Sequence, residues 1–378
     1  MDFSYTKEQL LIQKSAREFA KKELLPKAME RDENGIYPKE SLELMADLGF
    51  LGMLVSEEYG GMEVDTISYV LALSEIASAC ASTAVITSVH NSQVCELISK
   101  FGTKEQKQEY LNKLTTGEYM GSFAISEEGA GSDIYSISTT AKREGDYFIL
   151  NGKKRWIAGG ANSHLFIVFA KTDENNISAF IVTRDMQGFL QGESADKMGL
   201  RACDTTEIIF EDLKVPVKNL LGKENEGVKI AMSAFDLGRI GIAAISYGVA
   251  LAAFDIAVKY SKQRVQFNRP ICKNQGLRWM ISDMAVDLEA GKFLLLNAAL
   301  KRDKGENYSK DASIAKLYLS EMANRVVDKA LQIHGGYGYI KEYPIERMYR
   351  DVRAFTILQG TSQIQRNLIA NEIIGDKK

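Results

Sequence analysis

One segment of the sequence has the residue types that let a protein backbone approach a flat or anionic cofactor. It reads Ser126-Glu127-Glu128-Gly129-Ala130-Gly131-Ser132-Asp133. Small side chains expose the backbone N–H groups, and the two serine hydroxyls add hydrogen-bonding groups. A surface loop without a ligand explains this segment equally well when it is considered alone.

Two other side chains are of types that hold nucleotide cofactors. Trp156 ends a predicted strand, where an indole could stack on a planar ring, although a buried core tryptophan is the commoner case. Arg264 follows a long predicted helix, and its guanidinium could bind a pyrophosphate. The alternative for Arg264 is a solvated helix end.

The usual nucleotide-binding signatures are missing. The sequence has no Walker A loop, and no GxGxxG motif lies between a strand and a helix. The glycine-rich stretch Gly335–Gly338 follows a predicted helix, so by itself it indicates a helix end and a turn.

The elements that must position these residues fall into three regions. The first region is helical: Thr6 and Gln9 form a capping box, and helices are predicted over 38–48, 66–81 and 104–114. In the second region the period becomes strand-like, with short strands at 141–143, 147–150, 153–157, 166–170, 178–182 and 207–210. Asn151-Gly152 is a hairpin signal between two of them.

The third region is helical again, with long helices predicted over 227–263, 274–304, 310–334 and 361–374. The expected fold is therefore mixed α and β, with an N-terminal α-helical domain (1–120), a middle antiparallel β-barrel or sandwich (121–226) and a C-terminal four-helix bundle (227–378).

Bulk properties exclude several function classes. The 378 residues carry a formal net charge of −3, which gives no electrostatic reason to expect nucleic acid or an anionic membrane as a partner. The four cysteines are scattered without metal-ligand spacing. The first residues have neither the basic nor the apolar region of a signal peptide. We therefore expect a soluble, cytoplasmic protein.

The motifs, taken in order, resemble the acyl-CoA dehydrogenase family over essentially the whole chain, and most closely its short-chain (butyryl-CoA dehydrogenase-like) branch. The resemblance rests on Glu57–Gly61, the Ser126–Asp133 loop, Asn151–Ile157, Phe210–Asp212 with Val215-Pro216, Asp236–Arg239, Gln263–Ile271, Gln332–Tyr339, Tyr349–Asp351 and Gly360–Ser362. It implies FAD, an acyl thioester substrate, a homotetramer and an electron-transferring flavoprotein as the electron acceptor.

The resemblance also implies roles for individual residues. Ser126, Ser132, Trp156 and Ala158 would lie at the flavin ring. Arg264, Phe267, Gln332, Gly335 and Gly336 would hold the FAD of a neighbouring subunit. Thr361 and Gln363 would make further FAD contacts, and the substrate side would include Arg239, Asn91 and Gly360.

The sequence departs from the family where the chemistry is expected. Relatives remove the substrate α-proton with a carboxylate while hydride passes from the β-carbon to the flavin. The glutamate before the Gly-Thr-Ser turn is replaced by Gln359, and the site of the glutamate in a second branch is Gly238. An amide cannot accept this proton. Ala158 also replaces a family hydroxyl beside the ring.

Several functions are compatible with these changes. The preferred one is oxidation of an acyl group with altered proton handling on a carrier-protein-tethered substrate, where a hydroxyl or aldehyde carbon needs no α-carbon base. The alternatives are a conventional acyl-CoA dehydrogenase, an engineered Glu-to-Gln variant of one, a catalytically idle FAD-binding scaffold and an oxidase. No replacement base is obvious: the direction of Glu127 and Glu128 is open, and His90 is expected to pack.

Overall fold

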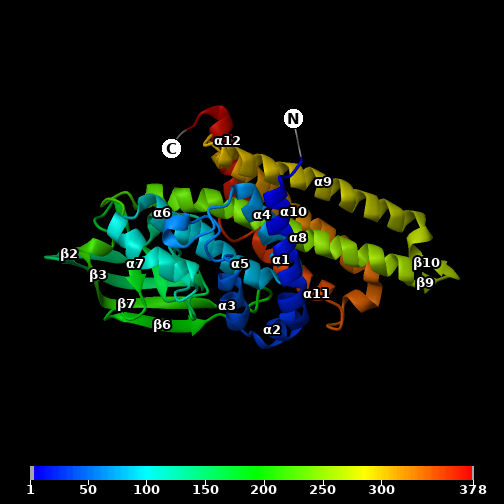
Figure 1. Cartoon of the computed structure of the whole chain (residues 1–378), viewed down its shortest axis with the longest axis horizontal. Helices are drawn as coiled ribbons and strands as arrows, with labels where there is room; N and C mark the ends of the chain where they lie inside the picture. The colour runs from blue at the N-terminus through cyan, green and yellow to red at the C-terminus, as the bar shows by residue number, and fades with distance from the viewer. Residues whose placement is uncertain (1–3, 377–378) are drawn as a thin grey trace.

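The computed structural model describes residues 4–376. The molecule is elongated, with the sheet module at one end and the long C-terminal helices extending to the other, as Figure 1 shows. Most of the N-terminal helices lie between them, against the middle of the longest helix, and the last two overlap the sheet module in this view.

The N-terminal region is helical, as predicted. Its helices are α1 (Lys7–Phe19), α2 (Ala28–Asn34), α3 (Lys39–Asp47), α4 (Thr66–Ala79), α5 (Ala81–Val89), α6 (Glu96–Phe101) and α7 (Lys104–Thr115), with a π-helical turn η4 (His90–Cys95) before α6. The capping box is confirmed, because the Thr6 hydroxyl accepts from the Gln9 N–H at 3.2 Å and the Gln9 amide oxygen accepts from the Thr6 N–H at 2.9 Å. The predicted helix over 66–81 ends at Ala79, since Cys80 is extended (φ −149°).

The middle region is one sheet with the strand order β6-β7-β3-β2-β4-β5-β8, and β1 pairs with β4. The strands are β1 (Gly121–Ala124), β2 (Thr140–Glu144), β3 (Tyr147–Ala158), β4 (Leu165–Lys171), β5 (Ile177–Thr183), β6 (Phe189–Ser194), β7 (Thr205–Pro216) and β8 (Leu220–Leu221). Most pairs are antiparallel, as predicted, but β1 and β2 each run parallel to β4.

The hairpin predicted at Asn151-Gly152 is wrong. Both residues lie inside the continuous strand β3, where the register with β7 shifts between Leu150 and Gly152. The Asn151 amide donates to Asp212 Oδ1 at 3.0 Å and accepts from the Asp212 N–H at 2.9 Å. This long-range pair turns a local hairpin signal into a β-bulge.

The C-terminal region contains the four predicted long helices: α8 (Gly227–Gln263), α9 (Gln275–Asp303), α10 (Ser309–His334) and α12 (Ser362–Ile374). A further helix, α11 (Ile345–Phe355), precedes α12, and a short hairpin of β9 (Val265–Gln266) and β10 (Arg269–Pro270) follows α8. One hydrophobic core joins the N-terminal helices to this bundle. Helix α8 is long and apolar enough to cross a membrane, but 67% of its most apolar window is buried in the fold.

Candidate active site and flavin cleft

The turn that carries Gln359 links α11 to α12 and has an unusual backbone. Gln359 and Gly360 both have positive φ angles, 51° and 88°. A side-chain-bearing residue adopts this conformation at a cost, so the surrounding contacts must hold it there. Thr361 fixes the exit of the turn by capping α12, its hydroxyl accepting from the Ile364 N–H at 3.3 Å.

Two buried side chains hold the turn from behind. Lys316 on α10 is fully buried and donates from Nζ to the Gly360 carbonyl at 2.6 Å. Gln365 donates to the same carbonyl at 3.0 Å. Burial and the nearby Arg239 charge lower the pKa of Lys316 to about 7. The Gln359 turn is therefore fixed by its backbone carbonyls, and its side chain is left to face the site.

The side chain of Gln359 meets residues from two distant segments. Its Nε2 donates to Gln93 Oε1 at 3.2 Å. Its Oε1 is buried and has no hydrogen-bond partner among residues 4–376. A Cβ placed on Gly238 would collide with that oxygen. Positions 238 and 359, where the resemblance places the two alternative family bases, are thus in direct contact.

The carboxylates of Asp236, Glu127 and Glu128 are paired elsewhere or exposed, so none of these three takes the place of the missing base at this turn. Asp236 lies two residues from Gly238, which is about 200° around the helix. It accepts from Arg239 at 2.6 Å and from Ser309 at 2.8 Å. Glu127 is also committed: burial opposes its ionisation, but Lys154 and two hydroxyls lower its pKa to about 2. Glu128 points outward, with an exposed side chain.

His90 is a packed residue, as expected, and does not accept protons near neutral pH. Its Nδ1 accepts from the Gly121 N–H at 3.1 Å and its Nε2 lies 3.1 Å from the Leu114 carbonyl. Complete burial lowers its pKa to about 4. The two backbone partners fix the ring as the neutral tautomer with the proton on Nε2.

Two residues predicted on the substrate side are buried. Asn91 donates to the Phe50 and Thr87 carbonyls and accepts from the Met53 N–H. Arg239 is 3% exposed and pairs with Asp236. Their direct role in substrate binding stays a prediction: the Asn91 amide is used within the protein, whereas the buried Nε of Arg239 has no hydrogen-bond partner among residues 4–376.

The residues predicted at the flavin ring gather where the Ser126–Asp133 loop crosses β3. The Ser126 carbonyl accepts from the Arg155 N–H at 2.9 Å, which holds the loop beside Trp156. The Trp156 indole is 56% exposed, so it is not a core residue. Its φ of 65° lies within an irregular stretch of β3 between Lys154 and Ile157. An exposed indole on a backbone with positive φ, beside an open loop, is the geometry of a stacking surface.

A buried ion pair supports this loop. Lys154 Nζ lies 2.7 Å from Glu127 Oε1, and both side chains are almost completely buried. Glu127 also accepts from the backbone N–H and the hydroxyl of Ser138 and of Thr139. Ser132 lies on the exposed side of the loop. Ala158 carries no hydroxyl, and the nearby Ser122 hydroxyl is occupied by the Ala158 carbonyl at 2.7 Å.

A second group of predicted FAD residues lies at the far tip of the molecule. A cleft of about 490 Å³ is lined there by Arg264, Gln332, Gly335 and Gly336, together with Tyr260, Gln266, Ile271, Ile333, His334, Tyr337 and Ile340. Phe267, on the β9–β10 hairpin, is 91% exposed with a φ of 52°. A Cβ added to Gly335 or Gly336 would meet no atom within 4 Å, so a ligand could approach their backbone.

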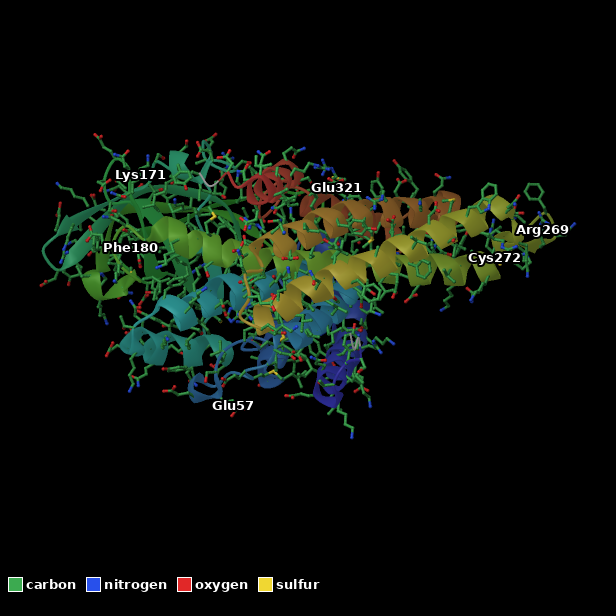
Figure 2. The ribbon with its side chains drawn as sticks, turned by 90° about the horizontal axis from the view of Figure 1, so that it is seen from above. Glu57, Lys171, Phe180, Arg269, Cys272 and Glu321 are labelled. Carbon is green, nitrogen blue, oxygen red and sulfur yellow. The ribbon has the colours of Figure 1, made fainter. Side chains whose placement is uncertain are left out.

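The two groups of flavin residues lie far apart in one chain. Helix α8 begins against Ile177 of the sheet and ends at the cleft, a length of about 55 Å for 37 residues. Figure 2 shows Lys171 and Phe180 at one end and Arg269 and Cys272 at the other. Gln363, exposed at the start of α12, and Thr361 lie beside the Gln359 turn.

Sequence reasoning missed Gln93 and Lys316. Gln93 lies in the buried π-helical turn η4, in the same turn as the predicted Asn91, but no motif marks Gln93 itself. Lys316 could have been found, because it interrupts the apolar stripe of α10 formed by Ala312, Ala315, Leu319 and Ala323. A lysine in such a stripe must be buried, and therefore needs a partner.

The comparisons with known proteins cover the whole chain. Residues 6–118, 122–213 and 225–374 match the models "Acyl-CoA dehydrogenase, N-terminal domain", "middle domain" and "C-terminal domain". "Acyl-CoA dehydrogenase, short-chain specific" of Clostridium acetobutylicum is 44% identical over 99% of this chain and 100% of its own. "3-(aryl)acrylate reductase" of Clostridium sporogenes is 46% identical over 98% and 99%.

Solved structures agree. Butyryl-CoA dehydrogenase from Megasphaera elsdenii superposes with a TM-score of 0.97, at 40% identity over 99% of this chain and 100% of that chain. The prolyl acyl carrier protein oxidase AnaB gives 0.94 at 30% identity over 98% and 100%. The fold and site define a three-domain flavoprotein oxidoreductase. The chain belongs to the acyl-CoA dehydrogenase family.

As a member of this family the protein is a FAD-dependent oxidoreductase. The described residues fit that cofactor: an exposed indole next to an open loop suits a ring, and a cleft with an arginine and two unobstructed glycines suits a pyrophosphate. FAD supplies the two-electron acceptor or donor. The chain itself supplies the binding surfaces and the polar groups around the substrate.

Proposed function

We propose that the protein transfers a hydride at the β-carbon of a short acyl thioester of coenzyme A, as a short-chain-type dehydrogenase or reductase. The observation that carries the proposal is the contact between Gly238 and Gln359. The two places where relatives keep their base converge on one spot, as a site for the acyl α-carbon requires. Relatives that are 44–46% identical and named as CoA dehydrogenase or acrylate reductase support the same assignment.

The proposal predicts a slow proton-transfer step. An amide at position 359 cannot hold the α-proton. Losing a general base costs on the order of 10²–10⁴ in rate. Oxidation and reduction share one transition state, so both directions are slowed by the same factor. We therefore expect weak desaturation of ordinary acyl-CoA by this protein with Gln359 in place.

Restoring the carboxylate tests the proposal. Bleaching of the flavin by butyryl-CoA is followed in a stopped-flow spectrophotometer for the protein and for Gln359→Glu. We expect the variant to be faster by about 10²–10⁴. Gln187→Glu, the same change at an exposed turn residue of the sheet module, is the control and should change nothing. Equal rates for the protein and Gln359→Glu would refute the assignment of position 359.

A second candidate is oxidation of a carrier-protein-bound substrate at a carbon that needs no α-carbon base. The absence of a carboxylate at both 238 and 359 favours it. The likeness to a prolyl acyl carrier protein oxidase also favours it, although at 30% identity this is a weaker relative than the CoA enzymes. Mass spectrometry of carrier-protein thioesters beside a panel of acyl-CoAs separates the two. Product on the carrier protein alone selects this candidate.

We propose that a second copy of the chain completes the flavin site. The predicted ring-side residues and the tip cleft lie toward opposite ends of α8, and this separation supports a flavin site shared between two subunits. We propose a homotetramer, as the family resemblance implies, located in the cytoplasm. An electron-transferring flavoprotein is the proposed electron partner, supported by a 44% identical relative named "Caffeyl-CoA reductase-Etf complex subunit CarC" from Acetobacterium woodii. Sedimentation of the FAD-loaded protein tests the assembly.

A further inference from the structure

Gln93 is a buried residue of η4, and its side chain reaches the Gln359 turn. Its neighbours in η4 form hydrogen bonds to the backbone: Asn91 donates to the Phe50 and Thr87 carbonyls, and Ser92 donates to the Ser88 carbonyl. Gln93 is 3% exposed, and within residues 4–376 its side chain bonds only to Gln359. A buried amide with one hydrogen bond out of four possible ones is under-used.

The side chain of Gln359 is also only partly hydrogen-bonded. Its amide nitrogen donates one of its two N–H groups to Gln93 Oε1, while its own oxygen is buried without a donor in the described part of the chain. An unpaired buried acceptor costs about 1–3 kcal/mol. The pair therefore offers one unpaired buried acceptor, Gln359 Oε1, and N–H groups that are not used between the two amides, among them those of Gln93 Nε2.

Gln359 Oε1 and Gln93 Nε2 both lie next to Gly238 of α8. A Cβ on Gly238 would collide with Gln359 Oε1 and would lie 3.4 Å from Gln93 Nε2. Any side chain at position 238 would fill this point and cover both atoms. Because Lys316 and Gln365 hold the turn by its backbone, the terminal amide of Gln359 can rotate toward a ligand without moving the turn.

We propose that Gln93 and Gln359 together bind a hydroxyl group on the acyl chain, next to its α- or β-carbon. This rests on the proposed function, which places position 359 beside the acyl α-carbon. A hydroxyl donates one hydrogen bond and accepts another, so it satisfies Gln359 Oε1 and Gln93 Nε2 at once.

Other substituents match the pair less well. An ammonium group donates to Gln359 Oε1 but cannot accept from Gln93 Nε2, and a carboxylate does the reverse. A plain alkyl chain leaves both atoms unpaired. A site built to hydrogen-bond a hydroxyl discriminates strongly against the analogue that lacks it, because the buried polar groups are then left without partners. The substrate class is therefore a hydroxyacyl thioester.

The test compares dissociation constants of the FAD-loaded protein for butyryl-CoA, 2-hydroxybutyryl-CoA and 3-hydroxybutyryl-CoA, read from the change in flavin absorbance. We expect one hydroxyacyl-CoA to bind at least tenfold more tightly than butyryl-CoA. Gln93→Leu removes the donor, and Gln93→Glu keeps an acceptor for the Gln359 amide but also removes the donor. Both variants should bring the ratio of the dissociation constants for butyryl-CoA and for the preferred hydroxyacyl-CoA toward one, whereas the remote control Gln187→Leu should not change this ratio.

Equal affinity of the unmodified protein for all three thioesters would overturn the inference, whatever the variants do. A ratio unchanged by Gln93→Leu and Gln93→Glu would do the same, because it would give Gln93 only a packing role. These outcomes differ from failure of the proposed function. If the proposed function fails, butyryl-CoA does not bind, or Gln359→Glu does not accelerate its oxidation. Equal affinity for the three thioesters does not change the outcome of either of those two measurements.

Discussion

Lys316 carries a buried charge whose cost the structure allows to be worked out. Its side chain is fully buried on α10, and its one hydrogen bond among the described residues goes to the Gly360 carbonyl at 2.6 Å. Burial first and Arg239 second lower its pKa from 10.5 to about 7, with only Glu321 acting in the opposite direction. The shift corresponds to roughly 5 kcal/mol between the two protonation states.

The sign of the pH dependence follows from proton counting. Below pH 7 the lysine is charged in both the folded and the unfolded chain, and the folded state bears the full cost. Between pH 7 and about 10.5 the folded lysine is neutral while the unfolded one still binds a proton. Because the unfolded state binds more protons in this window, the free energy of unfolding contributed by Lys316 rises with pH.

Lys316→Met removes this titration and keeps the side-chain volume. It also removes one hydrogen bond to the turn, worth about 1.5–3 kcal/mol for a charged donor, although Gln365 still donates to the same carbonyl. We expect the variant to equal or exceed the protein in stability at pH 6 and to be less stable near pH 10. Urea unfolding followed by tryptophan fluorescence at both pH values measures this.

The difference in unfolding free energy between the two proteins decides the matter. A difference that is the same at pH 6 and pH 10 would refute the reasoning, because it would mean that Lys316 keeps an ordinary pKa in the folded state. Lys316→Arg is the matched comparison. It retains a charge across the whole range, so its stability should lack the rise with pH that the lysine gives.

Three other substitutions test the electrostatics of the fold and the cofactor cleft. Burial raises the pKa of Asp351 to about 6, although the Leu200 N–H donates a hydrogen bond to this carboxylate. The free energy of unfolding, measured with urea, should therefore fall as pH rises from 4 through 6, and Asp351→Asn should abolish that fall. Parallel pH profiles of stability for the protein and the variant would contradict this prediction. Glu127→Gln leaves Lys154 charged and buried without its partner, so we expect a loss of about 3–5 kcal/mol in unfolding free energy. Adding Lys154→Met should recover part of this loss, whereas a loss below about 1 kcal/mol would argue against an ion pair shielded from water. Arg264→Ala should weaken FAD binding at least tenfold, measured from the flavin absorbance retained after dialysis, and full retention would remove Arg264 from the cofactor cleft.

The helices and their limits were set largely by local sequence. The prediction of a helix over 227–263 matches α8 residue for residue, and the capping box of α1 forms as Thr6 and Gln9 predict. These features depend on side-chain period and on hydrogen bonds between residues three or four apart. The order of motifs likewise indicated the family and its cofactor, because each motif is a short contiguous segment.

Pairing between distant segments was beyond the sequence. Asn151-Gly152 is a hairpin signal locally, but Asn151 bonds with Asp212, which lies 61 residues away, and the chain continues straight through as a bulged strand. The parallel pairing of β1 with β4 also joins strands separated along the chain. Such contacts are decided by which strands the core brings together.

The site shows the same division most clearly. The sequence alone determined that both base positions, Gly238 and Gln359, lack a carboxylate. Only the tertiary structure decided that the two positions touch, that Gln93 reaches them from η4, and that Lys316 holds the turn from α10. The physical reason is that a residue's type is local, whereas the partner that satisfies or orphans its buried polar atoms is chosen by packing across the whole chain.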